Sequence, residues 1–404
     1  MKGSNSLFLH RIFKGIGDSC LKVFIPLLIY QHTANFNLCL LYLCISYFLT
    51  SVLFATMKNP IRKAPLLFII LHILPLMATS VLLTLDMTIL IVVALGVLDA
   101  VATTFYYAPL NLMFAFLDKN ADTAKFEAGQ NLGKIIFAFL GAFLLGDVKN
   151  SLVFVIIFSC VIYLISVIPL CLNYRDLKDI AKKEENQTFT SSVKNCGEFN
   201  LFHIFTGVFS FVKETFLPLY LYISGLSFST VGYMVAIQYV LNILAGYVAK
   251  FADKKGKTKL STIINSIVLF AGMIVVCVVK NSAVIYAFSL VVGFSYSVLF
   301  TSYFTKFVFS QTKKNNRIGG TFARDFVQNS ARETCTLVCF IPFSFPIFIV
   351  GICSSVGIML SGLKCDKVIE KEKLESEEAS LTSQQNILAN ENESEIKKTS
   401  ENKN

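Results

Sequence analysis

Residues 22–30 read KVFIPLLIY and residues 214–222 read ETFLPLYLY, so Phe, Pro, Leu and Tyr recur 192 positions apart. A second, polar match lies 198 positions apart, and in it an acid, Gln, Asn and a base keep one register. Its members are Glu127, Gln130, Asn131 and Lys134 in the first copy and Asp325, Gln328, Asn329 and Arg332 in the second. Two matches at nearly one offset indicate an internal duplication. The shared prolines, Pro26 and Pro218, predict a kink at the same place in each copy, because proline cannot donate to the helical ladder.

The composition is that of a membrane protein. Of the 404 residues, 54% are hydrophobic and 15% are charged, against about 25% charged in an ordinary soluble domain. The apolar residues form blocks of about 20, the length that a helix needs to cross the hydrocarbon of a bilayer. Breaks rich in charge, Pro, Gly and Asn separate twelve predicted helices: 7–30, 36–57, 65–85, 88–117, 127–146, 151–172, 199–223, 228–250, 260–279, 282–308, 320–341 and 343–363. The sequence therefore predicts an all-α polytopic membrane protein made of two parallel six-helix repeats.

The charges of the loops predict the orientation. Eighteen Lys and Arg lie in the loops on one side of the predicted membrane and two on the other, which places the first side and both termini in the cytoplasm. A plasma membrane is expected, or the inner membrane in a bacterium. The predicted domains are an N-terminal bundle (1–172), a cytoplasmic linker (173–198), a C-terminal bundle (199–363) and a disordered cytoplasmic tail (364–404). The net charge of +10 is spread over these loops, so it indicates no nucleic-acid partner.

Charged residues inside the predicted helices indicate a polar pathway, because a charge that faces lipid is strongly unfavourable. Asp18 and Lys22 are four residues apart and are expected to pair with each other or to meet a solute. Asp99 has no base nearby on its own helix, so it is either a proton carrier or one partner of an interhelix pair. The residues predicted to bind solute or to couple transport are Asp18, Lys22, Asp99, Lys134, Lys213, Glu214, Gln328, Arg332 and Glu333.

The duplicated polar ribbon has two interpretations. Its Gln and Asn residues make a stripe that cannot face lipid at low cost, and its bases lie deeper in the membrane than its acids. In the first interpretation, Lys134 and Arg332 bind the anionic part of a solute, whereas Glu127 and Asp325 belong to a cytoplasmic gate. In the second, all four residues only tie the two halves together.

The end of predicted helix 8 contains Gly246, and the loop that follows contains Asp253, Lys254, Gly256 and Lys257. This pattern, with twelve helices in a 6+6 repeat and a long charged central loop, resembles the major facilitator superfamily over residues 7–363. The resemblance implies a central cavity lined by helices 1, 4, 7 and 10. It also implies a gating role for Asp253, Gly256 and Lys257, with Asp253 facing the start of helix 5. The corresponding first-half loop, 57–63, keeps the bases but lacks the Asp and Gly, and helix 5 lacks the Gly-Pro signature of antiporters.

We therefore expect a secondary transporter that moves a small polar solute, charged or zwitterionic, by alternating access, with protons as its coupling ion. Two alternatives stay open: multidrug efflux, because helix 10 is rich in Tyr and Phe, and a non-transporting sensor or scaffold, because the first-half loop is incomplete. No enzyme is expected, since the sequence has no phosphate-binding loop, nucleophile triad or hydrolase carboxylate pair. No cofactor or metal is expected, because the 11 Cys form no CxxC pair. The expected partners are the solute, protons and the lipid bilayer, and the expected oligomeric state is a monomer.

Overall fold

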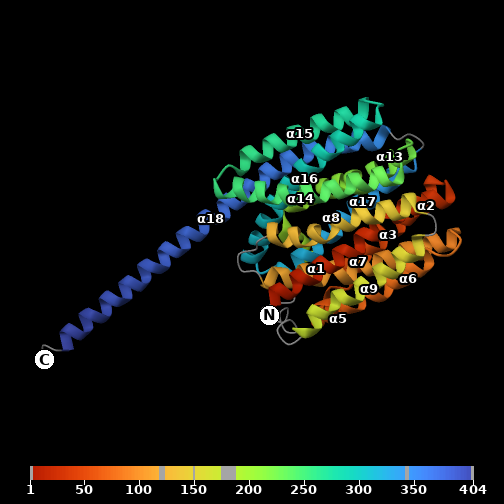
Figure 1. The fold of residues 1–404 in the computed structure, drawn as a ribbon. Helices are drawn as coiled ribbons and strands as arrows, with labels where there is room; N and C mark the ends of the chain where they lie inside the picture. The colour runs from red at the N-terminus through yellow and green to blue at the C-terminus, as the bar shows by residue number, and fades with distance from the viewer. Residues whose placement is uncertain (1–2, 118–122, 149–150, 174–187, 342–344, 402–404) are drawn as a thin grey trace.

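A computed structural model describes residues 3–117, 123–148, 151–173, 188–341 and 345–401. Within these ranges the regular structure is helical, and the long helices run side by side in one bundle (Figure 1). The first half contains α1 (Gly3–Cys20), η1 (Lys22–Phe24), α2 (Ile25–Thr33), α3 (Phe36–Thr56), α4 (Lys58–Lys63), α5 (Pro65–Leu71), α6 (Ile73–Leu82), α7 (Ile89–Leu117), α8 (Thr123–Asp147) and α9 (Ser151–Leu172). The second half contains α11 (Phe189–Cys196), α12 (Phe199–Phe211), η3 (Val212–Phe216), α13 (Leu217–Ile223), α14 (Phe228–Lys254), α15 (Thr258–Val278), α16 (Ser282–Lys313), α17 (Arg317–Cys339) and α18 (Phe345–Glu401).

Ten helical segments in the described part of the chain are long and apolar enough to cross a membrane. The two remaining predicted spans correspond to α1 with α2 and to α17. Both carry several charged residues, so neither is as apolar as the other ten. The structure is thus an all-α membrane fold, and its segments are consistent with the predicted twelve.

The predicted kinks lie at equivalent positions of the two halves. The first helix is interrupted by the 3₁₀ turn Lys22–Phe24, which ends two residues before Pro26. The matching helix of the second half is interrupted by the π-helical turn Val212–Phe216, which ends two residues before Pro218. A proline has no N–H to donate, so the carbonyl four residues earlier loses its partner and the ladder deforms there. The two copies therefore share the position of the break but not its helical type.

Matching contacts inside each half confirm the internal duplication. A Cβ added at Gly15 of α1 would lie 2.6 Å from the carbonyl oxygen of Gln130 in α8. A Cβ added at Gly207 of α12 would lie 2.6 Å from the carbonyl oxygen of Gln328 in α17. Both glycine positions differ by 192 and both glutamine positions by 198, the offsets found in the sequence. In each half the first helix therefore packs against the fifth at a glycine, and the helices approach so closely there because glycine has no side chain.

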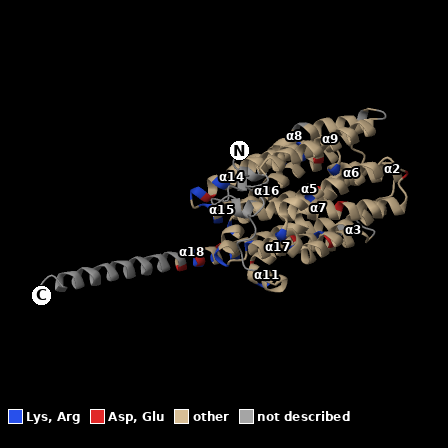
Figure 2. Ribbon diagram, turned by 90° about the horizontal axis from the view of Figure 1, so that it is seen from below, with Lys and Arg blue, Asp and Glu red and all other residues tan. Residues whose placement is uncertain are grey.

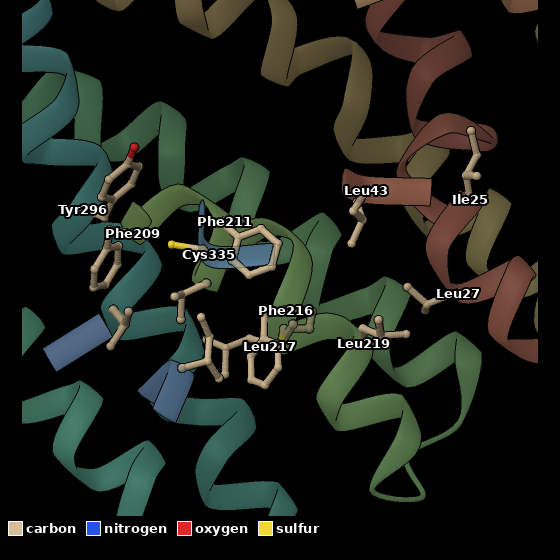
Figure 3. Packing of buried hydrophobic residues seen from close by; sticks show 14 of the residues in the cluster. Ile25, Leu27, Leu43, Phe209, Phe211, Phe216, Leu217, Leu219, Tyr296 and Cys335 are labelled. Carbon is tan, nitrogen blue, oxygen red and sulfur yellow. The ribbon is translucent and has the colours of Figure 1, made fainter. Parts of the chain in front are cut away.

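The two halves meet through α8 with α14 and through α3 with α17. Their shared core brings together side chains that are far apart in the sequence, such as Ile25, Leu27 and Leu43 of the first half beside Phe211 and Leu219 of the second (Figure 3). Tyr30 and Tyr222, which end the two matching nonapeptides, contact each other with ring centroids 6.0 Å apart. A contact between equivalent residues is expected where two repeats face each other across a pseudo-twofold axis.

The C-terminal tail differs from the prediction of disorder after residue 363. Helix α18 continues from the bundle to Glu401 and projects away from it (Figure 1). The segment is rich in Glu, Lys and Gln, which are good helix formers, and Lys371 pairs with Glu375 one turn later at 3.8 Å. Glu370 also pairs with Lys259 at the start of α15, 2.8 Å apart, which ties the first part of the tail to the bundle. Charge and polarity alone do not reveal these local and tertiary pairs.

The predicted linker contains the short helix α11, and residues 174–187 lie outside the described part. Helix α11 packs against α17, with the rings of Phe189 and Phe326 5.3 Å apart. Figure 2 shows Lys and Arg gathered near the end of the bundle from which α18 projects. This is the end that carries the loops predicted to be cytoplasmic.

Candidate functional site

A cavity of about 410 Å³ lies between the two halves. Its lining comes from α1, η1, α2, α3, α7 and α8 of the first half and from η3, α13, α14, α16 and α17 of the second. Eight of the nine residues predicted to bind or couple line it, and the ninth, Glu333, does not. Asp325 also lines the cavity, whereas Asp253, Gly256 and Lys257 do not, and Glu127 lies outside the residues whose side chains are described.

The sequence suggested that Asp18 pairs with Lys22. In the structure Asp18 instead pairs with Lys14, which lies four residues before it. Both partners are buried, and the hydroxyl of Tyr163 donates to Asp18 Oδ1 at 3.2 Å. The reason is local: α1 ends at Cys20, so Lys22 lies on a 3₁₀ turn. The regular i,i+4 geometry that the pairing with Lys22 requires is therefore absent.

Lys22 instead pairs with Asp99 of α7, with 2.8 Å between Nζ and Oδ1. Its ammonium also donates to Thr103 at 2.9 Å, while Ser46 of α3 donates to the second carboxylate oxygen of Asp99 at 2.5 Å. Asp99 is thus one partner of an interhelix pair, the second of the two possibilities raised by the sequence. The pair joins three helices at the cavity wall, and a role of Asp99 in proton coupling stays a prediction.

Glu214 lies between two bases of the second half. Its carboxylate is 4.0 Å from Lys213 Nζ and 3.9 Å from Arg332 Nη2. Arg332 is held by a hydrogen bond from its Nε to Ser210 at 2.8 Å, and Lys213 donates to Ser297 at 3.2 Å. The side chain of Glu214 is 52% exposed, against 2% for Lys213, so the acid faces the cavity while its basic neighbour is enclosed.

Lys134 reaches the cavity from α8 of the first half. Its ammonium lies 5.0 Å from the ring centroid of Tyr239 on α14, in the geometry of a cation–π contact. Among the described residues it has no carboxylate within 4.0 Å, which makes it a base without an ion-pair partner. From its distance along the helix, Lys134 is not expected to contact Glu127. In the structure its neighbour is the aromatic ring of Tyr239.

Asp325, which the sequence assigns to a cytoplasmic gate, lines the cavity. It pairs with its neighbour Arg324 and accepts a hydrogen bond at 3.1 Å from Asn111 of α7. This bond crosses from one half to the other at the cavity wall. An apolar cluster also joins the two halves, with the rings of Phe54 and Phe322 6.0 Å apart.

The contact expected for Asp253 is different in the structure. Its Oδ1 accepts hydrogen bonds from Thr258 at 2.6 Å and from Ser302 at 2.9 Å, both in its own half. The resemblance had placed it against the start of helix 5 in the opposite half. Two hydroxyl donors within reach of the loop satisfy the carboxylate locally, so no partner from the other half is required.

Several cavity residues were not among the predicted site residues. Arg11 donates to Gln130, whose amide in turn donates to the hydroxyl of Tyr107 at 3.1 Å. Asn242 of α14 accepts from Ser297 at 2.6 Å. Uncharged polar residues in a membrane sequence cannot be assigned to a cavity from the sequence alone, because they occur both in cavities and in contacts between helices. Only the charged residues inside predicted helices, Arg11 and Arg324, were detectable in advance.

A family model described as Major Facilitator Superfamily matches residues 7–328. The chain belongs to the major facilitator superfamily. It is therefore a multi-pass membrane transporter, and its partners include a small-molecule solute.

Among solved structures, the chain is similar to two crystal structures of a bacterial homologue of the iron transporter ferroportin in an outward-facing state, one with soaked iron. The TM-scores are 0.67 for the soaked structure and 0.68 for the other, each with 13% identity over 91% of this chain and 100% of that chain. At this identity the likeness establishes the fold alone. No match was found among curated proteins.

Proposed function

We propose that this protein is a secondary active transporter that moves a small polar solute, charged or zwitterionic, by alternating access. The observation that carries the proposal is a cavity between two repeats, lined by acids and bases from both halves. Charged side chains are tolerated inside a membrane protein where they face one another or a polar solute. A site at the interface of two repeats can open to either side when one half rocks against the other.

In this proposal Lys134 and Arg332, one from each half, bind the anionic part of the solute. Asp99 couples transport to protons: when a proton neutralises its carboxylate, Lys22 loses its partner and the contact between α7 and η1 weakens. The gate comprises Glu127, Asp325 and the loop residues Asp253, Gly256 and Lys257. We further propose a plasma-membrane location, or the inner membrane in a bacterium, with both termini cytoplasmic and a monomeric chain.

Multidrug efflux is the second candidate, and a specific observation favours it. Tyr296, Phe300 and Phe304 of α16 line one wall of the cavity, and their rings stack with centroids 6.0 Å apart in each successive pair. An apolar cation could lie against such a wall. The charged residues around the rest of the cavity favour a polar solute, and we therefore rank efflux of apolar drugs second.

The proposal is tested with purified protein in liposomes. Exchange of labelled solutes, beginning with an untargeted metabolite mixture, is expected to exceed that of protein-free liposomes. Lys134→Gln and Arg332→Gln are expected to weaken solute binding in calorimetry, whereas Glu127→Gln is expected chiefly to change the transport rate. Folded protein that exchanges no solute would contradict the proposal and favour a sensor or scaffold.

A further inference from the structure

The charges that line the cavity do not balance. Three of its four acids have a base of their own: Asp18 pairs with Lys14, Asp99 with Lys22 and Asp325 with Arg324. Arg11 also lines the cavity and donates to Gln130. The fourth acid, Glu214, lies near two further bases, Lys213 and Arg332. Lys134 is the third base of this set, and among the described residues it has no carboxylate within 4.0 Å.

This set of three bases and one acid, which we call the basic cluster, carries two positive charges in excess. The excess is unfavourable in an enclosed site, because like charges repel strongly where little water screens them. The side chain of Lys213 is 2% exposed and that of Arg332 is 26% exposed, so bulk water screens neither positive charge fully. The cluster therefore favours a ligand that brings two negative charges.

Glu214 is held loosely compared with the other acids. Its contacts at 4.0 and 3.9 Å exceed hydrogen-bond distance, whereas Asp99 lies 2.8 Å from its base. Its side chain is also 52% exposed, against 13% for Asp99. A carboxylate in this position is a weak internal counter-ion, which an anion at hydrogen-bond distance from Arg332 can displace.

We infer that the solute is a compact dianion, such as a dicarboxylate or a phosphate monoester, and that it replaces Glu214 at Arg332 and Lys213. This inference rests on the proposed transport function and names its substrate class. Its anionic oxygens meet Arg332 and Lys213 of the second half on one side and Lys134 of the first half on the other. In a dicarboxylate these oxygens belong to two carboxylates, and in a phosphate monoester they belong to one phosphate group. A cavity of about 410 Å³ has room for such a molecule.

Binding in this way joins the two halves. Lys134 comes from α8 and Arg332 from α17, so a dianion between them adds an electrostatic bridge across the interface. A monoanion can satisfy only one side of the interface. The second charge thus distinguishes a solute that draws the halves together from one that merely occupies the cavity.

The test compares probes that have the same carbon skeleton and different charge. Succinate, its monoamide succinamate and its diamide succinamide are titrated into purified protein in nanodiscs by calorimetry, with glycerol 3-phosphate and glycerol as a second series. We expect affinity to fall about tenfold or more with each charge removed, because each removal takes away a charge-assisted hydrogen bond. Whichever dianion binds more tightly identifies a carboxylate or a phosphate ligand.

Three variants assign the effect to the basic cluster. In Lys134→Gln, succinate and succinamate are expected to bind equally, because the second charge has lost its partner. In Lys280→Gln, which alters an exposed base outside the cavity, the preference for succinate is expected to remain. In Glu214→Gln, the dianion is expected to bind more tightly, because its internal competitor is gone.

Weaker binding of the dianion in Glu214→Gln would overturn the inference, since it would show that Glu214 binds a cationic group of the solute. The inference also fails if neutral or monoanionic probes bind as tightly as the dianions, or if liposomes exchange another solute while neither dianion binds. In that last case the proposed transport function stands. Folded protein that exchanges no solute would contradict both this inference and the proposed transport function.

Discussion

The ion pair between Lys22 and Asp99 offers the sharpest test of the site's architecture. Its atoms are 2.8 Å apart, and its side chains are 20% and 13% exposed. At that distance and an effective dielectric constant of about 20, the attraction is about 6 kcal/mol before the desolvation of either group is subtracted. Removing one partner of a buried pair destabilises a protein by about 3–5 kcal/mol, because the other charge is left alone. Since both groups face the cavity, we expect Asp99→Asn to lower the free energy of unfolding by about 3 kcal/mol, the lower end of that range.

The assay is thermal unfolding of the purified protein. An unfolding entropy of about 2.1 cal/mol/K per residue over 404 residues converts about 3 kcal/mol into a Tm lowered by about 3–4 °C. Lys22→Gln is expected to cause a similar loss. The double variant is expected to recover most of the loss, since neither charge then remains unpaired. A double variant as unstable as the sum of the two single variants would refute the reasoning.

The same variant tests the role of Asp99 in coupling. If Asp99 carries the proton, Asp99→Asn abolishes concentrative transport driven by a pH gradient, while solute exchange across liposomes remains measurable. Equal loss of both activities would leave Asp99 with only its structural role. The comparison is made at a temperature well below the lowered Tm, so that unfolding does not contribute.

Three further predictions address topology, burial and packing. Single Cys reporters at Asn186 and Ser227, in a background without other Cys, should label from the cytoplasmic and external sides respectively; labelling of both from one side would contradict the twelve-helix topology. Burial raises the pKa of the Cys196 thiol to about 12, so a water-soluble maleimide at pH 8 should modify it only after unfolding, because the thiolate is the reactive form. Replacing Gly15 or Gly207 with Ala should cost about 1–3 kcal/mol in each case, because the added Cβ forces two helices apart; unchanged unfolding midpoints would show that the helices do not pack this closely.

Much of the fold could be predicted from the sequence because the bilayer restricts what a chain can do. Apolar blocks of membrane length, loop charges on one side and the repeated prolines Pro26 and Pro218 predict a duplicated helical bundle without knowledge of any contact. The charges inside helices were also informative, since lipid excludes them. That is why eight of the nine predicted binding or coupling residues line one cavity.

Which partner each charge takes was decided only by the tertiary structure. Lys22 is four residues from Asp18, yet it pairs with Asp99 because the helix breaks between them and an acid from α7 lies within reach. Pairing between helices depends on their rotation and depth, which sequence spacing does not specify. The loose position of Glu214 between Lys213 and Arg332 arises in the same way, from the packing of α12 against α17. The sequence thus determined which groups the membrane forces inside, and the fold alone determined which of them remain available to a solute.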